Sequence, residues 1–354
     1  MSEGPDAAAA LRGRIEQLAL GHALSSILFT ACELDLFGLL AGGPASAADL
    51  AARSGAAATG VSRLCTALVA LGLVDRLADG TFGAAAGTVT LLAGDGPGSL
   101  RPLLLYHRRQ LAPLLGRLPD AVRQARPQHE AWSFASAGAG QRSSYEELAL
   151  HPEEYELFLE AMDRSSAGVG DDIARAFPLG EIGRLLDLGG GSGRIGRELL
   201  AAAPRLEVEM VDLPVACRMA TRRAAEAGLA ERFRATAADL TRPLAGPAPA
   251  PGDAVLLSGV LADFTPGDCA QILANAALLL RPGGVLLVSE TLLDEARTGP
   301  LMPALLSLIM LAATPGDSFT LSELTALLGR GGFVVREHHP PPAPGRRDIV
   351  VARR

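Results

Sequence analysis

Residues 185–196 read LLDLGGGSGRIG, and this stretch decides the fold. The apolar residues before Asp187 are typical of a buried β-strand, a glycine cluster follows, and residues 197–203 favour a helix. Glycine adopts positive φ and has no Cβ, so a ligand can approach the N-terminus of the helix closely. The stretch therefore predicts a strand, a tight turn and a helix that cradle a nucleotide.

The glycine pattern alone leaves the cofactor open. Gly191, Gly193 and Gly196 satisfy G-x-G-x-x-G, and Asp212 follows about twenty residues later, as in dinucleotide-binding folds. The loop is compatible with NAD or with another adenosine-bearing cofactor. An ordinary turn between strand and helix is the less favoured interpretation.

Strand-like and helical patterns alternate after residue 178. Five apolar runs predict strands, at 185–187, 208–212, 232–238, 254–258 and 285–290, and two further strands are expected near Val334 and Ile349. This alternation predicts a mostly parallel sheet with helices on both faces. Ligands of such sheets bind beyond the carboxyl ends of the strands. The polar residues at those ends are expected to form one site: Asp187, Asp212, Asp239, Ser258 and Glu290.

The N-terminal third predicts a helical domain. Residues 7–41 place apolar side chains on more than one helical face, which favours packing against a second copy of the chain. Two short helices and a hairpin at Asp79-Gly80 then form a winged-helix pattern. That pattern also occurs in DNA-binding proteins, but the second helix offers phosphates only Arg63, so dimerisation is favoured over nucleic-acid binding.

The composition excludes several classes of protein. The net charge of −7 gives no general attraction for nucleic acid or an anionic membrane. The four cysteines form no C-x-x-C pair, which argues against a zinc cluster. No apolar run reaches the roughly 18 residues of a membrane span, and the first ten residues lack signal-peptide features. We expect a cytoplasmic protein without a membrane partner.

Five motifs together resemble those of the S-adenosylmethionine-dependent O-methyltransferases that act on small molecules in plants and bacteria. They are LLDLGGGSG, VDLP at 211–214, AADL at 237–240, LLSGVLADF at 256–264 and LRPGGVLLVSE at 280–290. The resemblance displaces the NAD interpretation. It implies an α/β fold: a Rossmann-like class I methyltransferase domain with a mostly parallel seven-stranded sheet, S-adenosyl-L-methionine as cofactor, and a homodimer formed through the N-terminal winged-helix domain. The expected boundaries are 1–95 for the dimerisation domain, 96–178 for a helical pocket-forming segment and 179–354 for the catalytic domain.

The resemblance also implies roles for individual residues. Gly189 and Gly191 would hold the methionine part of the cofactor, and Asp212 the ribose hydroxyls. The remaining residues expected at the cofactor are Ser166 and Ser258 near its carboxylate, Asp239 and Leu240 at its adenine, and Asp187 and Leu213 beside them. Four residues are expected at the acceptor: Phe158, Met162 and Met310, which resemble positions in the wall of its pocket, and Ala262.

One position departs from the family pattern. Members carry a histidine base in the segment after the fourth strand of the sheet, and Ala262 stands there in this chain. Glu290 matches one of the two acids that flank this histidine, whereas Ser318 occupies the position of the other. The histidine ligands of metal-dependent relatives are also missing, so no catalytic metal is expected. We predict Glu290 and Asp263 as catalytic residues, with two structural alternatives: Asp263 orients or caps the following helix, and Glu290 holds a backbone amide.

Methyl transfer does not require the histidine. Placing an acceptor in line with a methyl group accelerates transfer more than a general base does, so an acidic phenol, an enol or an activated ring carbon could react by proximity. Asp263, Glu290 or Asp317 could instead remove the proton. The alternatives are an S-adenosylmethionine-binding hydroxylase, decarboxylase or pericyclase that transfers no methyl group, and a non-enzymatic winged-helix regulator. The predicted acceptor is an aromatic or polyketide-like natural product.

Overall fold

The computed structural model describes residues 5–96, 98–244 and 249–354. The chain forms two compact units, Met1–Arg109 and Gln110–Arg354, which we call the N-terminal unit and the sheet unit. Residues 110–178 belong to the sheet unit, whereas 96–109 belong to the N-terminal unit. The functional boundaries expected at 95/96 and 178/179 stay predictions.

The N-terminal unit contains the predicted short helices and hairpin. Its elements are α1 (Pro5–Glu33), α2 (Leu36–Ala41), α3 (Ala47–Ser54), α4 (Ala58–Ala70), β1 (Val74–Arg76), β2 (Phe82–Ala84), α5 (Thr88–Leu92) and α6 (Arg101–Tyr106). Ser46 caps α3 through a hydrogen bond from the backbone N–H of Asp49, and Gly55 ends this helix with φ of 72°. β1 and β2 pair in antiparallel orientation, as the winged-helix pattern predicts.

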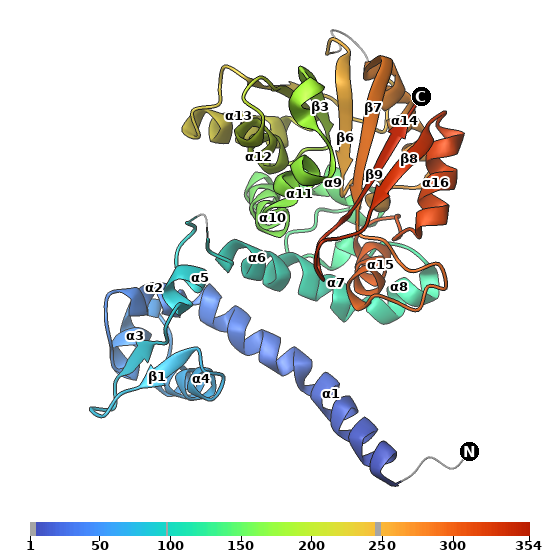
Figure 1. Ribbon diagram of the computed structural model, residues 1–354. Coiled ribbons are helices and arrows are strands. Elements are labelled where there is room, and N and C mark those ends of the chain that lie inside the picture. Colours follow the sequence, from blue (N-terminus) through green and yellow to red (C-terminus); the bar gives the residue numbers. More distant parts are fainter. Residues whose placement is uncertain (1–4, 97, 245–248) are drawn as a thin grey trace. The chain divides into compact units, whose positions relative to one another are not determined.

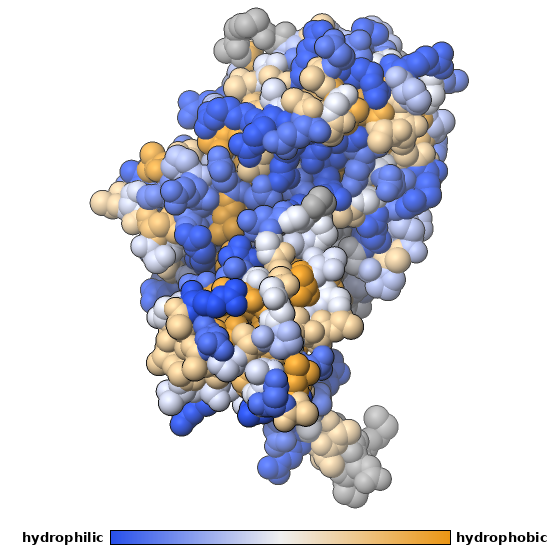
Figure 2. Space-filling model, turned by 90° about the vertical axis from the view of Figure 1, so that its left-hand side faces the viewer, coloured by the Kyte–Doolittle hydropathy of each residue, from blue (hydrophilic) through white to orange (hydrophobic). Residues whose placement is uncertain are grey.

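Helix α1 exposes large apolar side chains. Five of them are between 49% and 72% exposed: Leu11, Ile15, Leu18, Leu20 and Leu24. By length and composition alone residues 8–33 could cross a membrane, with a mean hydropathy of 1.2 over their most apolar window. This differs from the sequence-based expectation that no run is long enough to span a membrane; Arg12, Arg14 and Glu16 interrupt the first part of the stretch. Figure 2 shows one face of the molecule, where hydrophobic patches interrupt a largely hydrophilic surface. Apolar patches of this kind mark interaction surfaces in many proteins.

The sheet unit begins with short helices and then builds a seven-stranded sheet (Figure 1). The helical elements before the sheet are η1 (His107–Leu111), which starts in the N-terminal unit, α7 (Ala112–Gly116), α8 (Leu118–Gln124), η2 (His129–Ala131), η3 (Ala139–Gln141), α9 (Ser144–Ala149), α10 (Pro152–Ser165), α11 (Val169–Ala176) and η4 (Leu179–Glu181). The strands are β3 (Arg184–Leu188), β4 (Glu207–Asp212), β5 (Phe233–Ala237), β6 (Gly252–Ser258), β7 (Leu280–Glu290), β8 (Val334–His339) and β9 (Asp348–Arg353). All seven predicted strands are thus confirmed.

The strand order is β5-β4-β3-β6-β7-β9-β8. The neighbours from β5 to β7 are parallel, and β9 runs antiparallel to both β7 and β8. The chain leaves β3 toward β4 and β5, and later returns to the other side of β3 as β6. A crevice for ligands forms at such a reversal of strand order, outside the carboxyl ends of the strands.

Helices cover both faces of the sheet, as Figure 1 shows. The covering helices include α12 (Arg194–Ala202), α13 (Pro214–Glu226), α14 (Pro266–Leu279) and α16 (Leu321–Arg330), whereas α15 (Leu301–Ala313) packs against α7 and α8, and the short η5 (Leu261–Asp263) follows β6. Successive strand residues enter different cores: Leu185 packs in the core that includes α12 and α13, and Leu186 in the core that includes α14 and α16. Two buried faces explain why these strands are apolar at nearly every position.

Candidate active site

One cavity of about 400 Å³ lies beside the glycine turn and the carboxyl ends of the parallel strands. The residues expected at the cofactor all line it: Ser166, Asp187, Gly189, Gly191, Asp212, Leu213, Asp239, Leu240 and Ser258. Phe158, Met162 and Asp263 line it as well. Glu290, Ala262 and Met310 are not among its lining residues. The structure therefore brings together twelve of the fifteen sequence-predicted residues.

The turn after β3 requires its glycines. Gly189 and Gly191 have φ of 76° and 59°, a region that residues with a Cβ rarely adopt. A Cβ on Gly189 would also lie 2.7 Å from Cγ2 of Val260, so the turn packs closely against the segment that follows β6. Backbone rather than side chain thus faces the cavity at this point.

Asp212 holds this turn in place from the end of β4. Its Oδ2 accepts a hydrogen bond from the N–H of Gly191 at 2.8 Å, and its Oδ1 accepts one from the N–H of Leu213 at 2.6 Å. Burial raises the pKa of Asp212, and these two hydrogen bonds oppose the shift. Each carboxylate oxygen can accept a further hydrogen bond, so the side chain can still receive a pair of neighbouring hydroxyls.

Asp187 presents an unsatisfied polar atom. The side chain is 1% exposed, and its Oδ2 finds no hydrogen-bond partner among the described residues. Burial, together with the nearby Asp212, raises the pKa of Asp187 to about 7. Buried polar atoms are rarely left without a partner. This one lies in a residue that lines the cavity.

The end of β5 is fixed by hydrogen bonds of its own. Oδ1 of Asp239 accepts from the N–H and the hydroxyl of Thr241, and the carbonyl oxygen of Leu240 accepts from Asn275 at 2.9 Å. The two residues expected at an adenine ring are thereby held at the wall of the cavity.

Aromatic side chains form another wall. Tyr145 stacks on Phe264 with ring centroids 5.9 Å apart, and it meets Phe158 edge-on at 5.9 Å. Tyr155 and Met162 also line the cavity. Such a wall suits a flat, largely apolar molecule.

Asp263 meets this aromatic wall. The hydroxyl of Tyr145 donates to Oδ2 of Asp263 at 2.5 Å. Burial raises the pKa of Asp263 to about 6, while the Tyr145 hydrogen bond and the charge of Arg347 act in the opposite direction. Thr265, and not Asp263, caps α14, so the capping part of the structural alternative is wrong; that Asp263 orients this helix stays a prediction.

Glu290 lies behind the wall of the cavity. It is 4% exposed, and its Oε1 accepts the N–H groups of Val260 and Leu261 at 3.1 and 3.0 Å. Burial raises its pKa to about 7; Arg347 opposes this shift and Asp263 adds to it. The contacts match the structural alternative for Glu290, in which it holds backbone amides and so positions the segment that leads to Asp263.

The other expected residues outside the cavity have structural contacts. The carbonyl oxygen of half-buried Met310 accepts hydrogen bonds from the N–H and the hydroxyl of Thr314. The backbone of Ala262 packs closely against Gly316. A Cβ at position 316 would lie 1.8 Å from the carbonyl oxygen of Ala262. At the position of the second acid, the hydroxyl of Ser318 donates to the carbonyl oxygen of Pro303. Among the described residues, no histidine lines the cavity.

Sequence analysis misses many of the lining residues, including Tyr145, Phe264 and Arg347. Tyr145 follows Trp132 and Phe134 in a segment that concentrates aromatic residues, which is a usable signal in a chain with 4% aromatics. Phe264 stands next to Asp263 in a motif already singled out. Arg347 gives no local signal, since Arg346 and Arg347 resemble an ordinary charged pair before a strand.

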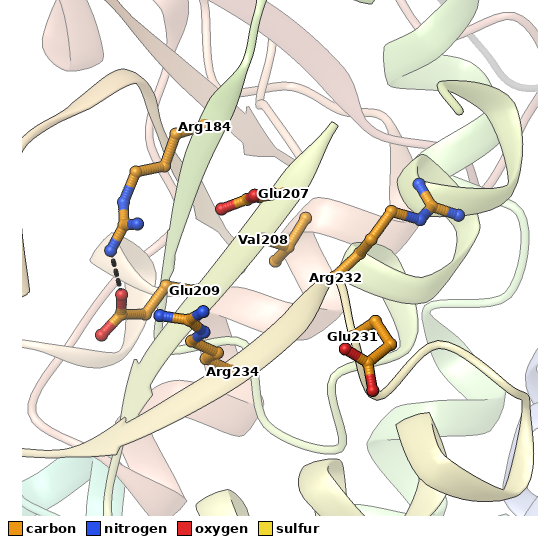
Figure 3. A pocket seen from close by; sticks show the side chains of 7 residues that line it. All are labelled: Arg184, Glu207, Val208, Glu209, Glu231, Arg232 and Arg234. Carbon is orange, nitrogen blue, oxygen red and sulfur yellow. Dashed lines mark hydrogen bonds and ion pairs between the residues drawn. The ribbon is translucent and has the colours of Figure 1, made fainter. Parts of the chain in front are cut away.

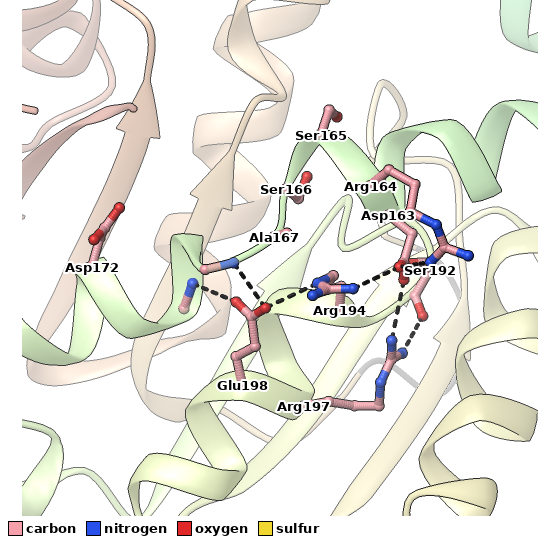
Figure 4. A network of polar contacts seen from close by, with 12 residues as sticks. Asp163, Arg164, Ser165, Ser166, Ala167, Asp172, Ser192, Arg194, Arg197 and Glu198 are labelled. Atoms are coloured by element: carbon pink, nitrogen blue, oxygen red, sulfur yellow. Dashed lines mark hydrogen bonds and ion pairs between the residues drawn. The ribbon is translucent and has the colours of Figure 1, made fainter. Parts of the chain in front are cut away.

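A polar network ties helix α10 to the glycine turn (Figure 4). Asp163, 1% exposed, accepts hydrogen bonds from Ser192 at 2.7 Å and from Arg194 at 2.9 Å. Arg197 and Arg223 also form ion pairs with it. Burial opposes ionisation, but the Ser192 hydrogen bond and the arginines hold the pKa of Asp163 below its usual value.

A second hollow lies near the amino ends of β3, β4 and β5 (Figure 3). It is lined by charged residues, including the ion pair of Arg184 with Glu209, and has a volume of about 10 Å³. This is room for about one water molecule. The larger cavity is therefore the candidate active site.

Comparisons with known proteins place the chain in a family. The O-methyltransferase domain family matches residues 115–334, and the O-methyltransferase dimerisation domain family matches residues 16–93. Acetylserotonin O-methyltransferase of Gallus gallus is 33% identical over 90% of this chain and 91% of its own length. The 3-hydroxy-5-methyl-1-naphthoate 3-O-methyltransferase of Streptomyces sahachiroi is also 33% identical, over 90% of this chain and 88% of its own.

A solved structure agrees over the whole length. The crystal structure of human N-acetylserotonin methyltransferase in complex with SAM superposes with a TM-score of 0.85 at 29% identity, and covers 100% of this chain and 99% of the other. The fold and the family expected from the five motifs are thereby confirmed. The chain belongs to the O-methyltransferase family and carries that family's dimerisation domain at its N-terminal end.

Proposed function

We propose that this chain transfers a methyl group from S-adenosyl-L-methionine to an oxygen of a small aromatic acceptor. The observation that carries the proposal is the single cavity in which the expected cofactor residues, an aromatic wall and Asp263 meet. Family membership and the relatives named above support methyl transfer over the non-methylating alternatives.

The residues present fit the cofactor. Gly189 and Gly191 leave backbone exposed for a close approach, and Asp212 keeps acceptor capacity for two ribose hydroxyls. Asp187 lines the same cavity beside the glycine turn. When bound, the cofactor would supply a sulfonium methyl group: the acceptor oxygen would bond to the methyl carbon while the carbon–sulfur bond breaks and S-adenosyl-L-homocysteine leaves.

Asp263 is proposed to receive the acceptor's proton. A carboxylate with a pKa of about 6 is ionised at neutral pH, and it is a stronger base than an ordinary aspartate. Tyr145 already donates to Oδ2, so Oδ1 is proposed as the oxygen that receives the proton of the acceptor hydroxyl. The proton moves from that hydroxyl to Oδ1 as the oxygen forms its new bond to carbon. Tyr145, Phe158 and Phe264 are proposed to align the acceptor, so that its oxygen lies close to the methyl group.

The acceptor is proposed to be a phenol or a related aromatic natural product. The aromatic wall favours a flat ring, and the related Streptomyces enzyme is named for a hydroxynaphthoate. A phenol of low pKa suits this site best, because a carboxylate takes its proton more readily than that of an ordinary phenol.

The test is incubation with methyl-labelled S-adenosyl-L-methionine and a panel of phenols, naphthols and hydroxynaphthoates, followed by mass spectrometry. Label on an acceptor oxygen is the expected result. Label on a ring carbon would replace O-methylation by C-methylation. An acceptor that changes mass while the methyl group stays on the cofactor would contradict methyl transfer and favour the hydroxylase, decarboxylase or pericyclase alternative.

The assembly is proposed to be a homodimer formed through the N-terminal unit, in the cytoplasm and without nucleic acid or a membrane. The dimerisation-domain match covers most of α1, whose exposed apolar side chains a second copy would bury. Light scattering of the purified chain tests this: a monomer at micromolar concentration would contradict the proposal.

A further inference from the structure

The loop between β8 and β9 reaches the edge of the sheet at which the cavity lies. Residues 340–347 connect the two strands, and Asp348, the first residue of β9, pairs with Glu290 at the carboxyl end of β7. The last two residues of the loop are therefore beside the candidate active site. Those residues are Arg346 and Arg347.

Arg346 fastens the loop to the start of α11. Its Nε donates to Oδ2 of Asp172 at 2.6 Å, and its Nη1 donates to the carbonyl oxygen of Ala167 at 2.8 Å. Nη2 also donates to the carbonyl oxygen of Gly168. With its guanidinium engaged in this way, Arg346 is a structural anchor.

Arg347 has a different environment. It lines the cavity, where Nη1 donates to the hydroxyl of Ser258 at 3.0 Å and Nη2 to that of Ser166 at 3.5 Å. Among the described residues it forms no ion pair with a carboxylate at salt-bridge distance. Both hydrogen bonds go to hydroxyls, and Glu290 and Asp263 act on it only through their charge. A partly buried guanidinium with hydrogen-bond donors to spare is a strong site for an anion.

The backbone makes room for this guanidinium. Gly259 has φ of 64°, and a Cβ there would lie 2.6 Å from Nη1 of Arg347. The next residue, Val260, packs against Gly189 of the glycine turn. Arg347 therefore lies at the end of β6, close to the glycine turn.

The length of the cofactor links the two ends of the cavity. Asp212 ends β4 and Asp239 follows β5, and the adenosine part is proposed to bind there. S-adenosyl-L-methionine carries its carboxylate at the end opposite to the adenine, and crossing the glycine turn from β5 leads past β3 to β6. We propose that Arg347 binds the carboxylate of the cofactor's methionine part, between the hydroxyls of Ser166 and Ser258. This inference rests on the proposed function.

The binding experiment separates this role from others without any turnover. Calorimetry compares two ligands: S-adenosyl-L-homocysteine, which has the carboxylate, and 5′-methylthioadenosine, which keeps the adenosine part and lacks the amino acid. The Arg347→Gln variant should bind S-adenosyl-L-homocysteine on the order of 10- to 100-fold more weakly, the range for a lost charged hydrogen bond. Its affinity for 5′-methylthioadenosine should equal that of the wild type.

The experiment has a control variant, and several outcomes would contradict the inference. Arg336→Gln, at an exposed position of β8, should change neither affinity, and thermal unfolding shows whether each variant is folded. Equal weakening of both ligands would overturn the inference, since Arg347 would then only shape the cavity. Unchanged binding of both, with loss of affinity for an acidic acceptor, would also overturn it and assign Arg347 to the acceptor. A wild-type chain that binds neither ligand would overturn the proposed function itself.

Discussion

Tyr145 donates its hydroxyl hydrogen to Oδ2 of Asp263 over 2.5 Å, a contact between residues 118 positions apart. The same tyrosine ring stacks on Phe264, the neighbour of Asp263. Helix α9 thus supplies both a hydrogen-bond donor and an aromatic surface to the segment after β6. The proposed base is oriented by a residue from outside the strand and helix repeat.

The Asp263 carboxylate should control the pH dependence of methyl transfer. A base must be ionised, so kcat/KM in the wild type should fall as the pH drops below about 6, the pKa of Asp263. Asp263→Asn should lower kcat by about 10²- to 10⁴-fold and abolish this limb of the profile. Rates measured from pH 5 to 9 with one phenol check both points.

The Tyr145→Phe variant provides the matched test. Since the Tyr145 hydrogen bond lowers the pKa of Asp263, its removal should shift the limb to higher pH while the variant remains active. An unchanged limb in both variants would mean that the acceptor, and not Asp263, titrates there.

Asp212 should be required for cofactor binding but not for folding. Asp212→Ala removes the proposed ribose acceptor together with the hydrogen bonds to Gly191 and Leu213, and should weaken S-adenosyl-L-homocysteine by roughly 100-fold or more. Asp212→Asn, which keeps one side-chain oxygen, should lose less. Calorimetry supplies the affinities, with Asp75→Ala, at an exposed site of the N-terminal unit, as the control. Wild-type affinity in Asp212→Ala would refute the ribose assignment.

Glu290 should act on stability more than on chemistry. Glu290→Ala leaves the N–H groups of Val260 and Leu261 without a partner, at a cost of about 1–3 kcal/mol for each buried group. Glu290→Gln keeps an acceptor oxygen and should retain most of the activity. Denaturant unfolding and kcat for both variants check this. A large loss of kcat in a stable Glu290→Gln protein would restore Glu290 as a catalytic residue.

Asp187 should make the ligand-free protein less stable at high pH. Its pKa is raised from 3.8 to about 7 in the folded chain, so the folded state binds more protons than the unfolded state between these values. Stability therefore falls as the pH rises through this window. Asp187→Asn cannot ionise, and should gain on the order of 2 kcal/mol over the wild type at pH 8 and little at pH 4. Equal pH dependence of the two melting temperatures would disprove the assignment.

The strands and the cofactor side of the site could be predicted because their signals are local. Apolar runs, the glycine turn and polar residues at the carboxyl ends of strands follow one another along the chain, and the topology of the sheet then places Asp187, Asp212 and Asp239 at one edge. The acceptor side depends on tertiary packing. The contact of Tyr145 with Asp263 requires α9 to lie against η5, and no sequence period encodes that placement.

Tertiary packing also explains why some expected residues do not line the cavity. Glu290 does end its strand at the correct edge, but its side chain turns toward the backbone of Val260 and Leu261 and not into the cavity. Met310 shares an apolar helix with many similar side chains, so the sequence does not reveal which of them faces a ligand. Arg347 reaches the cavity from a loop that Arg346 fastens to the start of α11.

Helix α10 has two faces with opposite tolerance for change. Phe158 and Met162 line the cavity, while Asp163 joins the helix to Ser192 and to the arginines of α12 and α13. A displacement of the helix would break a buried ion-pair network, at a cost of several kcal/mol. New acceptors are therefore best accommodated by replacing side chains at 158 and 162 on a fixed backbone. For enzyme engineering, these two positions can be randomised together, whereas Asp163 should be kept in every library.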